Sequence, residues 1–239
     1  MRLWFVVLGI LLVCSACVQV TVYGDEHVDD QAVLPSYRTD KIETLPEVAP
    51  SDCPELFSDE FDDDDSSCWQ TWVGGWEERG GVYRATNKGA NIRTESVWVG
   101  GYKLEDYVFE ADLKTTLQTI SDAGLVFRYV NDDMYCYCGF NKNNHGKSLR
   151  LRILVDGKNT EDVFFFDYDD NQPYRLRAIA NGDKVSCEVI GYPETRLEIA
   201  KSMWLSGTVG FRNAHIAVDY DNAMVEKISW FDKYLPGSQ

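Results

Sequence analysis

The chain has 239 residues, and its 39 aspartates and glutamates outnumber 23 lysines and arginines, which makes the formal net charge −16. The length suits one large domain or two small ones, with enough residues for a sizeable core. The charge argues against a nucleic-acid partner, because neutralising a phosphate backbone needs clustered lysine and arginine. The acidity is concentrated in residues 25–65, which carry 15 acidic and 2 basic side chains, so the rest of the chain is nearly balanced.

Residues 1–17 have the plan of a secretory signal peptide: a basic start at Arg2, an apolar run over Leu3–Val13, then small residues. Ser15–Cys17 also resembles the bacterial lipobox, in which the cysteine is acylated and becomes the new N-terminus. We therefore expect Cys17 to anchor the protein to a membrane. Two alternatives stay open: plain secretion after cleavage, and an uncleaved anchor, since the stretch after Arg2 is uncharged for some 20 residues. All three place the protein outside the cytoplasm, secreted or at the cell surface.

Residues 18–54 have neither a helical nor a strand period. Aspartate, glutamate, proline, serine and threonine alternate there with single aliphatic residues. Such a segment cannot bury enough apolar surface to offset the entropy of ordering it, so we expect a disordered acidic linker. Cys53 and Cys68 bracket a short acidic segment at its end, and an oxidising compartment would let them form a disulfide.

Three further cysteines lie within the body of the chain. Cys136 and Cys138 are two residues apart in an apolar run, so they share one strand face and are expected to be packed core thiols. Cys187 is a candidate partner for either of them, and the sequence does not decide the pairing. With three histidines in all and no zinc-binding spacing, a zinc site is not expected.

From residue 55 to residue 232 the pattern changes to short runs of alternating polarity, separated by glycine, asparagine, aspartate and proline every 8 to 14 residues. Strands at this spacing, with hardly any helical periodicity, indicate an all-β fold, an antiparallel jelly-roll sandwich of two sheets. Residues 233–239 form a C-terminal tail.

The alternation assigns a direction to each side chain. In the run 107–114 the odd-numbered residues are apolar and are expected to face the core, which turns Glu110 and Asp112 outward. The same argument places Leu125, Phe127 and Tyr129 inside. Later runs put Val209 and Phe211 inside, and the last strand, 218–228, is expected to be interrupted near residues 221–222.

Several outward-facing side chains have the chemistry of a sugar site. An aromatic ring stacks on the apolar face of a sugar, and charged groups hydrogen-bond its hydroxyls. We expect Glu110 and Asp112 to face a hollow shared with Arg128, where Tyr135 and Tyr137 would stack on the sugar; whether Arg150 and Arg152 border the hollow or cover its rim stays open. The alternative is a solvated sheet face with cross-strand ion pairs. The candidate ligand-binding residues are Glu110, Asp112, Arg128, Tyr135, Tyr137, Arg150 and Arg152.

A series of motifs follows a characteristic order along the chain: Leu56–Phe61, Trp69, Trp72, Trp76, Val82, Tyr83, Tyr107–Asp112, Asp122–Arg128, Tyr174–Asp183, Gly207–Arg212 and Asp219–Asn222. This order resembles the concanavalin A-like lectin/glucanase domains, and within them the laminin-G-like jelly rolls of carbohydrate-binding module family 66 and of the 3-keto-disaccharide hydrolase or family 16-like domain. The resemblance covers about residues 55–230 and is more specific for the fold than for the ligand.

The resemblance implies a glycan bound on a concave sheet, with Arg128, Glu110 and Asp112 at positions that match the family's site. It also implies a structural calcium ion between an early strand and the last one, with Asp221 as a ligand together with Asp59 or Glu60. Calcium takes six to eight oxygen ligands, so backbone carbonyls would complete the shell. The alternative for Asp221 is an ordinary turn or bulge.

Whether the domain is an enzyme depends on Glu110 and Asp112. Related family 16 glycanases carry a third carboxylate on this strand, and this chain lacks it. Two residues apart, Glu110 and Asp112 would lie about 7 Å from each other by strand rise, a separation that inverting glycosidases can use. No other catalytic pattern is present. Carbohydrate binding without cleavage is the favoured interpretation; a glycoside hydrolase and a protein-binding surface domain are the alternatives.

Overall fold

The computed structural model describes residues 53–86, 93–100, 103–115, 121–201 and 204–228, all within the unit Asp40–Gln239. The predicted signal peptide, the acylation site Cys17, the linker up to residue 52 and the C-terminal tail lie outside the described residues. They stay predictions.

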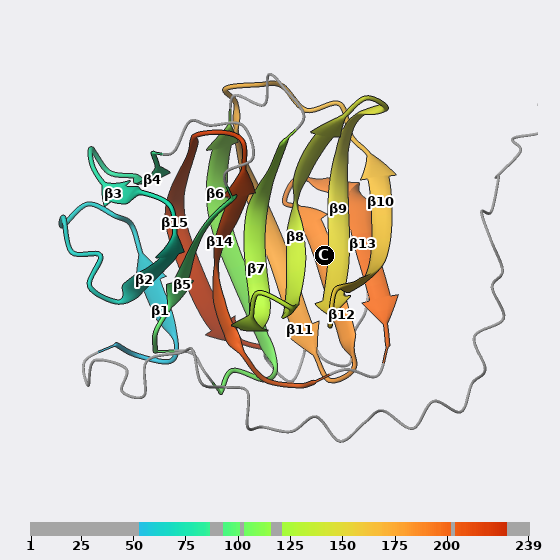
Figure 1. The fold of residues 1–239 in the computed structure, drawn as a ribbon, viewed down its shortest axis with the longest axis horizontal. Helices are drawn as coiled ribbons and strands as arrows, with labels where there is room; N and C mark the ends of the chain where they lie inside the picture. Colours follow the sequence, from blue (N-terminus) through green and yellow to red (C-terminus); the bar gives the residue numbers. More distant parts are fainter. Residues whose placement is uncertain (1–52, 87–92, 101–102, 116–120, 202–203, 229–239) are drawn as a thin grey trace, which may run out of the picture. The chain divides into compact units, whose positions relative to one another are not determined.

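The described residues form fifteen strands in two sheets, and all pairings between strands are antiparallel, as expected for a two-sheet sandwich (Figure 1). Sheet A has the order β13-β12-β11-β6-β15-β4-β3, with β1 also paired to β15. Sheet B has the order β10-β9-β8-β7-β14-β5-β2. The strands are β1 (Phe57–Asp59), β2 (Trp69–Val73), β3 (Trp76–Glu78), β4 (Tyr83–Ala85), β5 (Arg93–Trp98), β6 (Tyr107–Thr115), β7 (Ser121–Asn131), β8 (Met134–Asn143), β9 (Gly146–Val155), β10 (Lys158–Phe165), β11 (Pro173–Asn181), β12 (Lys184–Val189), β13 (Tyr192–Ala200), β14 (Thr208–Ala214) and β15 (Val218–Lys227).

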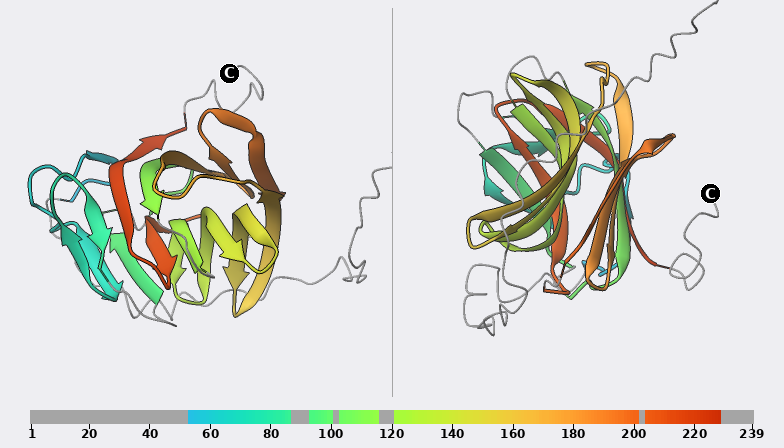
Figure 2. Two further views of the ribbon diagram at one scale, coloured as in Figure 1. Left: turned by 90° about the horizontal axis from the view of Figure 1, so that it is seen from above. Right: turned by 90° about the vertical axis from the view of Figure 1, so that its right-hand side faces the viewer.

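The two sheets are stacked face to face, and the core lies between them (Figure 2). The alternation predicted the inward residues of β6 correctly: Tyr107, Phe109, Ala111 and Leu113 are fully buried. Aromatic rings fill one end of this core, where Phe211 of sheet B stacks on Tyr220 of sheet A with ring centroids 4.2 Å apart. In the part of the chain that the structure describes, no helix is long and apolar enough to cross a membrane.

Two disulfides brace the sandwich. The predicted Cys53–Cys68 bridge is present. The second joins Cys138 of β8 to Cys187 of β12 and so ties sheet B to sheet A across the core. Cys136 remains a free thiol, and burial raises its pKa to about 12, which keeps it protonated and unreactive.

Two of the register shifts between strands bear on the predicted faces. In β15 the register shifts between Asp221 and Met224, where the sequence predicted an interruption, and Asn222 has a positive φ of 49°. In β7 it shifts between Phe127 and Asn131, and Arg128 has a φ of 47°. A bulge reverses the faces of the residues after it. Tyr129 therefore lies on the face of sheet B that points away from the core, where it packs with Val126, Tyr135 and Tyr137. Its predicted inward position is wrong.

The disulfides give a stability prediction. By loop entropy, the 49-residue loop closed by Cys138–Cys187 should stabilise the fold by about 4 kcal/mol, and the 15-residue loop closed by Cys53–Cys68 by about 3 kcal/mol. We expect the double variant Cys138→Ala/Cys187→Ala to lose more free energy of unfolding than Cys53→Ala/Cys68→Ala, as measured by urea denaturation. Equal losses, or the reverse order, would contradict a bracing role for the bridge between the sheets.

Candidate functional site

The seven predicted ligand-binding residues fall into three separate places. Glu110 and Asp112 belong to β6 in sheet A, whereas Tyr135, Tyr137, Arg150 and Arg152 belong to β8 and β9 in sheet B, and Arg128 lies between the sheets. Because the outer faces of two stacked sheets point in opposite directions, these residues cannot line one hollow. The prediction of a shared hollow is wrong.

On sheet A, Glu110 is held by two arginines of the neighbouring strand β11. Arg175 Nε donates to Glu110 Oε2 at 2.7 Å and Arg177 Nε donates to Glu110 Oε1 at 2.6 Å. Arg177 also pairs with Glu188 of β12 at 3.0 Å, which extends the ladder across three strands. Asp112 accepts from Arg175 Nη1 at 3.3 Å. This is the cross-strand ion-pair face that the sequence left open as the alternative, and it occupies both oxygens of the candidate catalytic Glu110.

Arg128 is a structural side chain, not part of an open face. The bulge in β7 turns it inward, and it is 0% exposed. Its Nη2 donates to the carbonyl oxygens of Gly182 at 2.6 Å and of Glu105 at 3.4 Å, and its backbone carbonyl accepts from Trp204 Nε1 at 2.7 Å. The guanidinium thus joins β7 of sheet B to two loops that flank sheet A.

The outer face of sheet B carries a cluster that we call the arginine–tyrosine cluster: Glu95, Asp122, Tyr135, Tyr137 and Arg212. The strand register brings its members together. Arg212 of β14 lies opposite Glu95 of β5 on one side and Gly124 of β7 on the other, and Gly124 lies opposite Gly139 of β8. Side chains from four adjacent strands therefore meet over two glycines.

The tyrosines of this cluster are on the predicted face but are covered. Tyr137 is 0% exposed, because its ring lies along its own strand over Gly139 and its hydroxyl donates to the carbonyl of Phe140 at 3.3 Å. A Cβ at Gly139 would overlap the Tyr137 hydroxyl, so this position requires glycine. The Arg212 guanidinium lies 5.3 Å from the Tyr135 ring centre and 5.9 Å from that of Tyr137. The expectation that these rings stack openly on a sugar is therefore wrong, because Arg212 covers them.

Arg212 holds the centre of the cluster electrostatically. Its Nε lies 3.0 Å from Glu95 Oε1, and Glu95 is itself fully buried. Burial alone would lower the pKa of Arg212, but the negative charges of Asp122 and Glu95 outweigh it and keep the pKa above its ordinary value. The guanidinium is therefore a permanent charge in a largely desolvated position.

Several polar atoms on this face are buried and have no hydrogen-bond partner. They include Arg212 Nη1, Asp122 Oδ1, Arg150 Nε and Gln70 Oε1, all from side chains of the outer face of sheet B. Buried atoms without a partner also occur elsewhere, for example in Arg128 and Glu78. Buried polar groups in folded proteins almost always have partners, so water or a ligand is expected to supply them. The atoms on the outer face of sheet B include both hydrogen-bond donors and hydrogen-bond acceptors.

Arg150 and Arg152 lie beside this cluster, as predicted for the outer face. Arg150 Nη2 donates to Asn141 Oδ1 at 3.0 Å, and both arginines approach Glu161 of β10, at 3.6 and 3.4 Å. Arg212, Asp122 and Glu95 were not among the site residues predicted from the sequence. The alternation that placed Phe211 and Leu125 inside already implied outward positions for the first two, whereas no strand had been assigned around Glu95.

The predicted calcium ligands Asp59 and Asp221 differ in their hydrogen bonding and electrostatic surroundings. Both oxygens of Asp59 are occupied, by the backbone N–H of Phe61 at 2.9 Å and by Trp69 Nε1 at 2.7 Å. Burial raises the pKa of Asp221, and the nearby Asp112 and Glu60 add to the shift. Among the described residues no three histidine, cysteine, aspartate or glutamate side chains are grouped so as to hold a metal ion. Asp59 and Asp221 as ligands of a calcium ion stay predictions.

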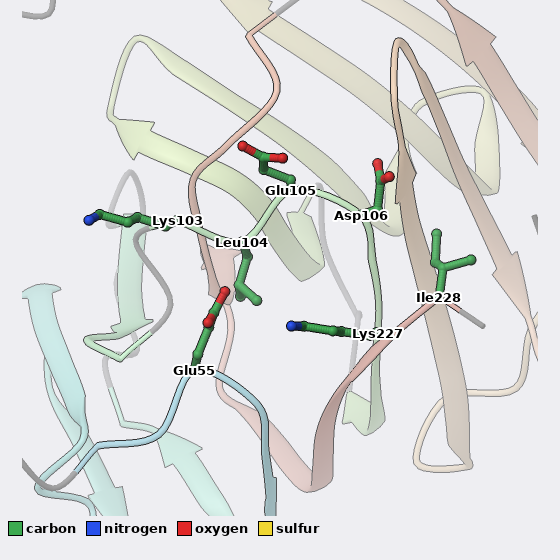
Figure 3. A pocket seen from close by; sticks show the side chains of 7 residues that line it. All are labelled: Glu55, Lys103, Leu104, Glu105, Asp106, Lys227 and Ile228. Carbon is green, nitrogen blue, oxygen red and sulfur yellow. The ribbon is translucent and has the colours of Figure 1, made fainter. Parts of the chain in front are cut away.

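A separate pocket of about 300 Å³ lies at the end of the sandwich where β6 begins and β15 ends (Figure 3). Its lining mixes three carboxylates with two lysines, and Figure 3 shows Lys227 reaching toward Glu55 and Leu104. It shares no residue with the arginine–tyrosine cluster. The lining residues are Glu55, Lys103, Leu104, Glu105, Asp106, Lys227 and Ile228.

Comparison with known proteins supports the fold. No protein-family model matches the chain, and no curated protein matches it. Among solved structures, the carbohydrate-binding module CBM66 from Bacillus subtilis superposes with a TM-score of 0.53 at 16% identity, covering 67% of this chain and 96% of that one. The GH43 protein BlXynB from Bacillus licheniformis gives 0.57 at 17% identity, covering 72% of this chain but only 39% of that one.

A Bacillus subtilis protein of unknown function with a galectin-like fold gives a TM-score of 0.56 at 12% identity, covering 72% of this chain and 94% of that one. At such identities the likeness shows the fold alone. The domain is thus a two-sheet β-sandwich whose fold is similar to that of CBM66, as the sequence motifs indicated.

The placement of Arg128 gives a second stability prediction. The variant Arg128→Met should lower the free energy of unfolding by about 2 kcal/mol, because the carbonyls of Gly182 and Glu105 lose a charged donor inside the protein. Urea denaturation measures the change. The control is Arg196→Met, at the exposed end of the ladder on sheet A, which should cost less than about 1 kcal/mol. Equal stability of the two variants would contradict the structural role of Arg128.

Proposed function

We propose that this concanavalin A-like domain is an extracellular carbohydrate-binding domain whose binding site is the outer face of sheet B, around Arg212, Asp122 and Arg150. The observation that carries the proposal is the set of buried, unpartnered donors and acceptors on that face. The similarity of the fold to a carbohydrate-binding module supports it.

The chemistry of these groups suits a sugar. A sugar hydroxyl both donates and accepts hydrogen bonds, so a site for it should present the two kinds of group side by side. Arg212 Nη1 and Arg150 Nε are donors, and Asp122 Oδ1 is an acceptor. A site for a bare anion would present donors alone. These charged groups are already desolvated and held in place, so they can bind a ligand with little further loss of side-chain entropy.

A membrane anchor would fit this function. The two disulfides are what an oxidising compartment permits, in keeping with the predicted export signal. Acylation at Cys17 with the acidic linker would hold many copies of the domain at a membrane. Their combined avidity would offset a modest affinity of each single site.

The experiment compares one variant on each outer face of the sandwich. Asp122→Asn keeps the shape of the side chain and removes the charge that faces the ligand; Asp219→Asn is the matched control on sheet A, where Asp219 pairs with Arg84. We expect Asp122→Asn to weaken binding about tenfold, the loss expected for one hydrogen bond to a charged group. Retention of the full chain in gels that contain xylan, xyloglucan, levan or cellulose derivatives measures it, and thermal denaturation checks folding.

Asp219→Asn should be retained like the wild type. The proposal is contradicted if the wild type is retained by none of these polysaccharides, or if the two variants are retained equally.

A further inference from the structure

An exposed aromatic ring stands on the same face as the arginine–tyrosine cluster. Phe165, at the end of β10, is 70% exposed, the highest value among the large apolar side chains described. Its neighbours Phe164 and Phe166 pack against the core, so the alternation of the strand directs Phe165 to the outer face. Val163, two residues before it on the same face, is also exposed.

The strand register connects Phe165 to the proposed site in a straight row. Phe165 lies opposite Ser148 of β9, Ser148 opposite Asn141 of β8, and Asn141 opposite Asp122 of β7. Arg150 and Arg212 lie in the adjacent row, two residues along their strands. We call this surface the outer strip: Asp122, Asn141, Ser148, Arg150, Phe165 and Arg212.

The outer strip is too long for one sugar. Neighbouring strands are about 4.8 Å apart, so the distance across the sheet from Arg212 on β14 to Phe165 on β10 is about 19 Å. This exceeds the width of a single sugar ring several times. Its two ends also differ in chemistry, with charged hydrogen-bonding groups at β7 and β14 and an open aromatic ring at β10.

The charges along the strip and its borders are balanced. Arg212 faces Glu95 and Asp122, while Arg150 and Arg152 face Glu161. Three guanidinium groups are thus matched by three carboxylates. A polyanionic chain would need an excess of positive charge along its path, whereas a neutral chain would not.

We propose that the ligand is a neutral oligosaccharide chain of at least three sugar units that crosses the strands from β14 to β10. One unit binds the polar groups of Arg212 and Asp122, and another stacks its apolar face on Phe165. The middle unit lies over Asn141, Ser148 and Arg150. This inference rests on the proposed function and adds the length, charge and direction of the ligand.

The test is calorimetry on the full chain with xylo-, cello- and fructo-oligosaccharides of one to six units. Affinity in the series that binds should rise with length up to at least three units. Phe165→Ala should weaken the binding of the six-unit chain about tenfold, the size of one aromatic contact, and leave the binding of the single sugar unchanged. Phe165→Trp should restore it. Leu205→Ala, which removes an exposed apolar side chain elsewhere, is the matched control and should behave like the wild type.

The outcomes separate this inference from the proposed function. If all lengths bind equally and Phe165→Ala changes none of them, the extended strip is overturned while carbohydrate binding stands. Tighter binding of a six-unit oligogalacturonate than of every neutral six-unit chain would overturn the neutral ligand. If none of the three series binds, this inference is overturned, and the retention experiment with polysaccharides decides the proposed function by itself.

Discussion

The shared core between the two sheets is the constraint on which the rest of this structure depends. Each strand has one face in that core, so the polar side chains that alternate with core residues along a strand lie on one of two outer faces that point away from each other. Glu110 and Asp112 are on one, and Arg150 and Arg152 are on the other. No rotamer change can bring the two groups together. Any ligand site built from strand residues must therefore belong to a single sheet.

The polar side chains on the two outer faces differ in whether all of their atoms have hydrogen-bond partners. On sheet A, Arg175, Arg177 and Glu188 continue a ladder in which the carboxylates and guanidinium groups bind one another. On sheet B, arginines are also paired with carboxylates, but Arg212 and Asp122 keep buried atoms without partners. A satisfied ladder stabilises the sheet and offers little to a ligand. Buried groups that lack partners cost free energy unless something else binds them, and this difference is why the proposed site is on sheet B.

The likeness to carbohydrate-binding modules and to GH43 proteins does not identify a function by itself, because one fold carries many activities. The likeness shows the fold, whereas the proposed site rests on the side chains of sheet B. The aromatic ring of the proposed site also differs from the one that the sequence predicted. Tyr135 and Tyr137 are covered by Arg212, whereas Phe165 at the edge of the sheet has an exposed ring.

The sequence by itself determined the fold class, the inward residues of β6, the interruption of β15 near Asn222 and the Cys53–Cys68 bridge. These follow from alternation, turn residues and local spacing, which are properties of neighbouring residues. It could not assign strands to sheets, because that depends on pairings between residues far apart in the chain. The sequence-based prediction therefore placed Glu110 and Tyr137 in one binding site, although they belong to different sheets. Nor could it foresee the bulge that buries Arg128, since Trp204, Gly182 and Glu105 come from distant segments and hold it only in the folded protein.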